Sequence, residues 1–179
     1  MPQPESTDRD LWVEWDEYNQ LIERLAVAVH RSGWAFDTVI CLARGGMRVG
    51  DVISRVFERP LGILATSSYR QAAGTLQGEL DIATHITLTR GRIAGRILLV
   101  DDLVDSGHTF GGVRDHLLAQ FPEIVELRTA VLWFKAHSVV TPDFYVHRLE
   151  TNPWIHQPFE QYDEMRPGEL AERLARKSQ

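Results

Sequence analysis

The segment ILLVDDLVDSGHTF, residues 97–110, carries the clearest signal of the fold. Four apolar residues predict a buried strand, and three carboxylates follow within five positions. Like charges at this spacing repel one another, so a positive or polar partner is expected to meet them. A Ser-Gly-X-Thr turn then leads into a predicted helix at residues 108–121. A buried strand, a polar turn and a helix in this order are typical of an α/β fold.

The segments on both sides continue the alternation of strands and helices. Predicted strands cover residues 36–43, 60–69, 85–89, 96–100, 127–134 and 142–150. Predicted helices cover residues 8–33, 44–58 after a Gly-rich turn, 108–121 and 167–178. We therefore expect an α/β fold with a mainly parallel sheet flanked by helices. Residues 1–10 are expected to be a mobile tail, and residues 11–179 a single domain.

The composition argues against several classes of protein. The net charge of −6 makes nucleic acid an unexpected partner, because such binding rests on neutralising phosphates. The single cysteine, Cys41, excludes an internal disulfide and a cysteine-based metal cluster. No apolar run reaches the length of a membrane span, and the polar N-terminus lacks the pattern of a signal peptide. We therefore expect a cytoplasmic protein.

A ligand is expected just after the strand at 96–100, because open parallel sheets bind ligands beyond the carboxyl ends of their strands. The pair Asp101 and Asp102 suits vicinal hydroxyls or a magnesium ion. The following turn suits a phosphate monoester, since a helix N-terminus offers converging N–H groups and Ser106 and Thr109 add hydroxyls. Phosphate, diol and cation in one place describe a sugar phosphate.

Two other interpretations of the acidic segment stay open at this point. A pair of aspartates at the end of a strand can be solvated or can cap the next helix. An apolar strand before Asp-Asp also occurs in the receiver domains of signalling proteins, which bind magnesium and accept a phosphoryl group. Receivers usually carry the pair after their first strand, whereas almost a hundred residues precede it here. The receiver interpretation also does not explain the Ser-Gly-X-Thr turn.

Residues 97–110 resemble the phosphoribosyl pyrophosphate signature of type I phosphoribosyltransferases: an apolar strand, Asp-Asp, two apolar residues and Asp-Thr/Ser-Gly-X-Thr. Ser106 replaces the commoner Thr of that signature, and His108 occupies its variable position. The resemblance implies that Asp101 and Asp102 contact the ribose hydroxyls and magnesium, with Asp102 as metal ligand and Mg2+ as cofactor. It implies a 5′-phosphate loop consisting of Asp105, Ser106, Gly107, His108 and Thr109, with Asp105 as the catalytic general base.

Two softer segments resemble other parts of the same family. LARGGMRVG, residues 42–50, resembles the pyrophosphate loop, which implies binding by Arg44, Gly45 and Gly46 and a cis peptide bond between Ala43 and Arg44. Taken alone, this segment is better explained as a plain strand-to-helix turn with solvated arginines. Ser68 and Tyr69 fall where the family places a mobile lid, although an ordinary surface loop also fits.

The C-terminal third resembles the bacterial xanthine-guanine branch of the family in WFKAHSVVTPDFYV, residues 133–146, and NPWIHQPFE, residues 152–160. The resemblance implies a small hood over the base, at about residues 142–165. There Lys135 would bind the purine 6-oxo oxygen, Trp154 would stack on the base, and Ile155 would add backbone contacts. A surface charge at Lys135 and core packing at Trp154 are the other interpretations. Residue 156 is His where relatives often have Glu, which leaves the preferred purine open.

The resemblance implies a magnesium-dependent 6-oxopurine phosphoribosyltransferase of purine salvage. Its substrates would be phosphoribosyl pyrophosphate and guanine, xanthine or hypoxanthine. A regulator that keeps the fold and binds phosphoribosyl pyrophosphate or a nucleotide without catalysis is the alternative. Relatives are dimers or tetramers, so a homo-oligomer is expected, with no nucleic acid and no membrane as partner.

Overall fold

The computed structural model describes residues 10–68 and 80–177, and the chain forms two compact units. The larger, here called the core unit, comprises residues 21–151. The smaller, the terminal unit, combines residues up to 20 with residues from 152 onward. Helix α1, Trp15–Arg31, begins in the terminal unit and ends in the core unit.

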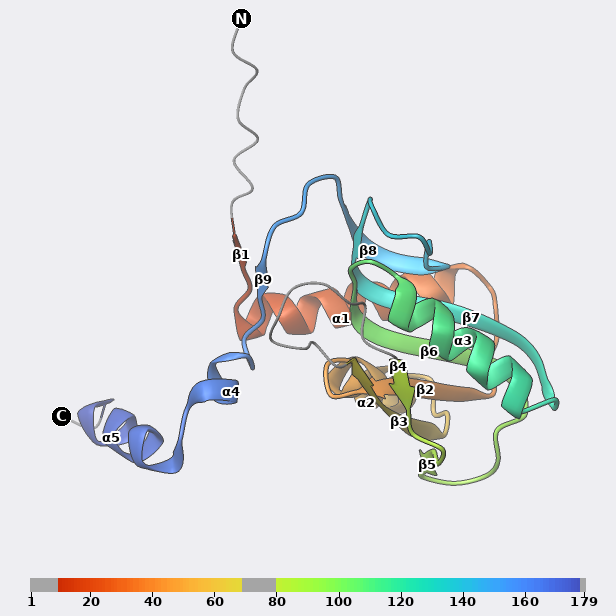
Figure 1. Cartoon of the computed structure of the whole chain (residues 1–179), viewed down its shortest axis with the longest axis horizontal. Helices are drawn as coiled ribbons and strands as arrows, with labels where there is room; N and C mark the ends of the chain where they lie inside the picture. Colours follow the sequence, from red (N-terminus) through yellow and green to blue (C-terminus); the bar gives the residue numbers. More distant parts are fainter. Residues whose placement is uncertain (1–9, 69–79, 178–179) are drawn as a thin grey trace, which may run out of the picture. The chain divides into compact units, whose positions relative to one another are not determined.

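A seven-stranded sheet forms the centre of the core unit (Figure 1). The strands lie in the order β4-β3-β2-β6-β7-β8, and β5 pairs with β3. Pairing is parallel from β3 through β8, whereas β4 and β5 run antiparallel to β3. The strand bounds are β2 Thr38–Ala43, β3 Leu61–Ser68, β4 Leu80–Ile82, β5 Thr87–Leu88, β6 Gly95–Val104, β7 Ile124–Lys135 and β8 Phe144–Leu149.

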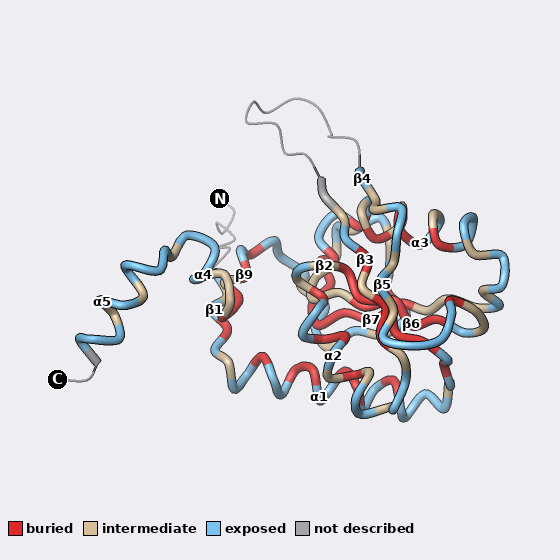
Figure 2. Tube along the Cα trace, turned by 90° about the horizontal axis from the view of Figure 1, so that it is seen from below, coloured by how far each residue is buried: buried red, intermediate tan, exposed pale blue. Residues whose placement is uncertain are grey.

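Helices cover both faces of this sheet. Figure 2 shows α1 and α2, Met47–Val56, on one side and α3, His108–Gln120, on the other. Strands covered on both faces are apolar throughout, which explains the unbroken runs that predicted them. The expected α/β fold with a mainly parallel sheet and flanking helices is confirmed.

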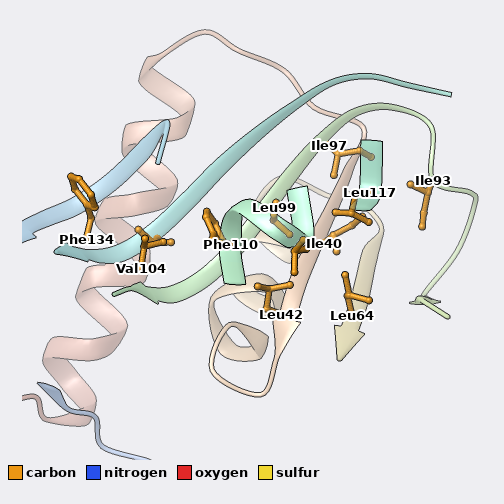
Figure 3. Packing of buried hydrophobic residues seen from close by; sticks show 12 residues of the cluster. Ile40, Leu42, Leu64, Ile93, Ile97, Leu99, Val104, Phe110, Leu117 and Phe134 are labelled. Carbon is orange, nitrogen blue, oxygen red and sulfur yellow. The ribbon is translucent and has the colours of Figure 1, made fainter. Parts of the chain in front are cut away.

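The main apolar core lies between the sheet and α3. Alternate residues of β2 and β6 point the same way and meet buried side chains of α3, as Figure 3 shows for Ile40, Leu42, Ile97, Leu99, Phe110 and Leu117. The intervening residues face the other helices: Cys41 is buried, and a Cβ added to Gly50 of α2 would lie 2.6 Å from its Cβ. Burial raises the pKa of the Cys41 thiol to about 12, so this cysteine acts as a small core residue.

Several predicted boundaries differ from the structure. Strand β6 continues to Val104 instead of ending at residue 100, because β7 stays paired with it along that stretch. The helix expected from residue 8 begins at Trp15, since residues 11 and 12 are taken up by a strand. The antiparallel strand β4 lies at residues 80–82, which the sequence assigned to no strand or helix. Each difference comes from pairing with a distant segment, which local periodicity does not report.

The terminal unit holds a two-stranded parallel sheet and two helices. Strand β1, Leu11–Trp12, pairs with β9, Ile155–His156. Helices α4, Gln161–Glu164, and α5, Pro167–Lys177, follow. Tyr18 of α1 is fully buried and meets the Phe159 ring edge-on at 5.7 Å. Across the described ranges of both units, no helix is long and apolar enough to cross a membrane.

Candidate functional site

The site lies where the strand order of the sheet reverses. From β2 the chain proceeds to β3 on one side, whereas β6, β7 and β8 follow one another on the other side. Ligands of open α/β sheets bind beyond the carboxyl ends of the two strands that flank such a reversal. In this chain the two strands are β2 and β6. The segments that follow them are the predicted pyrophosphate loop and the predicted ribose phosphate segment.

Asp101 and Asp102 lie at the point where β6 loses its neighbour β2. The β2–β6 ladder ends at the pair Cys41 and Val100, while Asp101 still pairs with Val131 of β7. The two carboxylates therefore belong to a strand that is held on one side only. The side of β6 that no longer pairs with β2 at this point faces the segment that follows β2.

The glycines after β2 lie directly against these carboxylates. A Cβ on Gly45 would come within 2.5 Å of Asp102 Oδ2, and one on Gly46 within 2.8 Å of the Val100 carbonyl oxygen. No side chain fits at either position, so the loop backbone reaches the acidic pair only because both residues are glycine. The peptide bond between Ala43 and Arg44 is cis, as expected, and the Arg44 side chain is exposed.

Asp101 is held in an environment that disfavours its charge. Burial of the carboxyl group, followed by the negative charge of Asp102, raises the pKa of Asp101 well above its ordinary value. The backbone N–H groups of Asp102 and Gly46 act in the opposite direction, and the first of them donates to Asp101 Oδ1 at 2.9 Å. Two adjacent carboxyl groups at this point favour a proton, a cation or ligand hydroxyls between them.

The predicted phosphate turn caps α3. Gly107 is the N-cap with φ +85°, a left-handed conformation that favours glycine. A Cβ at this position would clash with Ser138 Oγ and lie 2.9 Å from the Val140 nitrogen. The Val139 N–H donates to the Ser106 carbonyl oxygen at 2.9 Å. The turn is therefore fixed by the segment that follows β7, and His108 and Thr109 form the first residues of the helix.

Lys135 and Asp105 meet at the same edge of the sheet. Lys135 is the last residue of β7 and is only 5% exposed, which excludes its interpretation as a surface charge. Its Nζ lies 3.4 Å from Asp105 Oδ1. His137, which the sequence did not single out, places Nε2 3.1 Å from the same oxygen. Its closeness in sequence to Lys135 was the available signal, but residues 136 and 137 form a turn after β7 and have no periodic pattern of their own.

Trp154 and Ile155 lie in the terminal unit. Trp154 is 56% exposed, so core packing does not account for it, whereas Ile155 is buried in β9. His156 stacks on the Trp12 ring at 3.7 Å with planes 10° apart, and its Nε2 lies 3.1 Å from Asp10 Oδ2. Trp12, Trp154 and His156 line a cavity of about 720 Å³ within this unit.

The structure brings some of the predicted site residues together, and it does not describe others in full. The structure brings Asp101, Asp102, Gly45 and Gly46 together, and Asp105 with Lys135. For the lid, Tyr69 lies outside the described residues, and of Ser68 only its place at the end of β3 is described. Within the described ranges, no group of three or more His, Cys, Asp or Glu side chains is arranged to hold a metal ion.

The family model described as "Phosphoribosyl transferase domain" matches residues 14–164. A curated relative, xanthine-guanine phosphoribosyltransferase of Idiomarina loihiensis, is 25% identical over 157 residues, which cover 87% of this chain and 90% of the relative.

Two solved structures have the same fold. Xanthine-guanine-hypoxanthine phosphoribosyltransferase of Helicobacter pylori has a TM-score of 0.71 at 22% identity, over 87% of this chain and 96% of that one. A hypothetical protein of Neisseria gonorrhoeae with bound ppGpp has a TM-score of 0.66 at 20% identity, over 96% of this chain and 98% of that one. The second match therefore extends over nearly the whole length of both chains.

Proposed function

We propose that this chain, which belongs to the phosphoribosyl transferase domain family, transfers a 5-phosphoribosyl group from phosphoribosyl pyrophosphate to a 6-oxopurine. The products would be the nucleoside monophosphate and pyrophosphate, in purine salvage. The family match over residues 14–164 confirms the resemblance first indicated by residues 97–110. Guanine, xanthine and hypoxanthine are all candidate bases, and the curated relative acts by its name on the first two.

One observation carries the proposal: the backbone of Gly45 and Gly46 lies against the carboxylates of Asp101 and Asp102. A pyrophosphate needs close backbone donors and cations, and a ribose needs acceptors for its hydroxyls. Here a glycine loop with Arg44 lies beside an acidic pair, at the reversal of strand order where ligands bind. Asp105, Ser106, Gly107, His108 and Thr109 would then hold the 5′-phosphate at the start of α3.

The base would meet Asp105 and Lys135. Lysine is a donor without an acceptor, so it suits a 6-oxo oxygen and disfavours an amino group at the same position. Its burial supports this role, because a buried ammonium group needs a polar partner. The exposed ring of Trp154 would stack on the purine, and Ile155 would add backbone contacts.

A magnesium ion fits the proposed site only together with the substrate. Magnesium in phosphate sites is usually held by one or two carboxylates, water and the phosphates themselves. Asp102, next to the pyrophosphate loop, supplies one such carboxylate, and Asp101 a second oxygen donor once a cation offsets its disfavoured charge. When bound, the ion would neutralise charge on the leaving pyrophosphate.

The proposed reaction is a substitution at C1 of the ribose. The bond from C1 to the pyrophosphate oxygen breaks, and the developing negative charge is met by Arg44 and the amides of the glycine loop. The positive charge that develops on the sugar is stabilised by the neighbouring carboxylates. A purine nitrogen attacks C1 with inversion, and Asp105 accepts the proton released at N7 or at its neighbour.

The proposal is tested by an absorbance assay with phosphoribosyl pyrophosphate, Mg2+ and a panel of guanine, xanthine, hypoxanthine, adenine and uracil. Turnover is expected with one or more of the 6-oxopurines and to depend on the metal. Asp105→Asn is expected to lower kcat by about 100-fold or more while binding of phosphoribosyl pyrophosphate is retained. Full activity in this variant would remove Asp105 from the proposed role.

A second candidate function is nucleotide binding without catalysis. The Neisseria structure with bound ppGpp has the same fold over 96% of this chain. This favours a guanine nucleotide as the ligand of a regulator with this fold. Tight binding of ppGpp in calorimetry, with no turnover of any base in the panel, would support the regulator over the enzyme.

We also propose the setting in which the protein acts. A homo-oligomer, dimer or tetramer, is proposed from the resemblance, and analytical ultracentrifugation tests it. The cytoplasm remains the proposed location, where both substrates of salvage would be available. Nucleic acid and membranes are not proposed as partners, in keeping with the net charge of −6.

A further inference from the structure

Asp105 has two basic neighbours, and both reach the same oxygen. The distance to Oδ1 is 3.4 Å from Lys135 Nζ and 3.1 Å from His137 Nε2. The Asp105 side chain is 51% exposed, so it opens toward a ligand despite these contacts. Because both contacts use Oδ1, the carboxylate is held at one oxygen and Oδ2 is the one that a bound purine would meet.

His137 owes its position to the backbone around it. The Ala136 N–H donates to the Leu149 carbonyl of β8 at 2.9 Å, and the Ser138 N–H donates to the Lys135 carbonyl at 2.9 Å. The next residue, Val139, is bonded to Ser106 in the phosphate turn. The turn that carries His137 is therefore tied on one side to the sheet and on the other to the segment that carries Asp105.

We propose that His137 is a positioning residue for Asp105: its neutral imidazole donates a hydrogen bond to Oδ1, and its protonation slows turnover. The inference rests on the function proposed above. Nothing in the proposed roles of Lys135 or Trp154 requires a histidine at this position, so the geometry points to a role beyond them.

The effect follows from the proton transfer assigned to Asp105. An N–H bond of the purine breaks, its electron pair stays on the purine, and the proton forms an O–H bond at Oδ2. A neutral donor at Oδ1 orients the carboxylate for this step. A protonated His137 would add a second positive charge to that of Lys135, and opposite charges favour the ionised carboxylate over the protonated one. The carboxylate then becomes a weaker base.

The charged groups involved come from two elements. Asp105 faces His137 from the segment between β6 and α3, and Lys135 faces the same carboxylate from the end of β7. The imidazole of His137 is about half exposed, so protons of the solvent reach it.

The pH profile of kcat tests the inference. Wild-type kcat is expected to fall about tenfold as the pH is lowered and His137 takes up a proton. Glutamine places an amide N–H near the position of Nε2 and does not ionise, so His137→Gln should keep most of the rate at pH 7.5 and lose the acidic decline. His137→Ala, which removes both the donor and the ionisable group, should lower kcat about tenfold at pH 7.5 and should likewise lose the acidic decline. An acidic decline in His137→Gln equal to that of the wild type would overturn the inference.

A matched control and a second measurement separate this inference from the proposed function. His147→Gln makes the same change on an exposed position of β8 and should keep the wild-type profile. In nitrogen NMR at pH 7.5, Asp105→Asn should shift the Nε2 resonance of His137 and leave that of His147 in place. A protein with this NMR response and no turnover would refute the proposed function alone. A His137 resonance that ignores Asp105→Asn would refute the contact itself.

Discussion

The core unit and the terminal unit present their polar groups in opposite ways. In the core unit, Asp101 is desolvated and Lys135 is almost fully buried at the end of a covered sheet. In the terminal unit, Trp12 and Trp154 are 68% and 56% exposed, and His156 is held by one stacked ring and one carboxylate. The comparison indicates that a rigid, buried frame orients charged groups, while an open aromatic surface suits a planar ligand.

The largest expected difference between the units is in packing. Leu99→Ala removes a fully buried side chain of β6 and should lower the free energy of unfolding by about 2–5 kcal/mol. Leu174→Ala in α5 changes a side chain that is 56% exposed and should cost about 0.5 kcal/mol or less. Urea denaturation of both variants measures the contrast. Equal losses would mean that the two units are packed alike.

The next difference concerns two glycines. Gly45→Ala would place a Cβ within 2.5 Å of Asp102 Oδ2, whereas a Cβ at Gly168 of α5 meets nothing within 4 Å. Overpacking of this kind costs about 1–3 kcal/mol, which is about 5- to 150-fold in kcat/KM if it falls entirely on the transition state. Gly168→Ala should leave kcat/KM unchanged. Steady-state kinetics with varied phosphoribosyl pyrophosphate measures kcat/KM of both variants, and equal values would contradict the prediction.

The raised pKa of Asp101 predicts how the free energy of unfolding changes with pH. A folded-state pKa raised above that of the unfolded chain destabilises the fold at every pH above the unfolded value, which is about 4 for Asp. Asp101→Asn should therefore raise the free energy of unfolding at pH 7 without ligand or metal, and the gain should vanish as the pH falls to about 4. Turnover should fall in the same variant. A loss of stability at pH 7 would contradict the assigned cause.

The smallest effect is expected from the aromatic stack of the terminal unit. Trp12→Leu removes the stack on His156 and should cost about 0.5–1.5 kcal/mol of unfolding free energy. The ring protons of His156 should also lose the upfield NMR shift that a stacked indole causes. Val125→Ala, at an 81% exposed residue of the core unit, is the control and should change neither quantity. An unshifted His156 in the wild type would argue against the stack.

The sequence allowed most of the core unit to be predicted because its signals are local. Residues 97–110 contain a strand, an acidic pair and a helix start in unbroken order, and all three are present in the structure. The glycine loop after β2 and its cis bond were predicted from the resemblance in the same way. These features are set by neighbours in sequence and by burial on both faces of the sheet.

What the sequence did not predict depends on distant pairing. Strands β1 and β9 have two residues each, and they pair across more than 140 positions of chain, so neither has a periodic pattern of its own. The partnership of His156 with Trp12 and Asp10 follows from that pairing. His137 was missed for a similar reason, since its role depends on Asp105, which lies in another segment of the chain.

The hydrogen bond from Val139 to Ser106, with the close approach of Gly107 to Ser138, has a consequence for protein engineering. The segment after β7 and the turn before α3 hold each other in place, although about thirty residues separate them in the sequence. Chimeras that exchange residues 135–140 with those of a relative would disturb the turn unless residues 105–109 are exchanged with them. A chimera should therefore take both segments from the same parent protein.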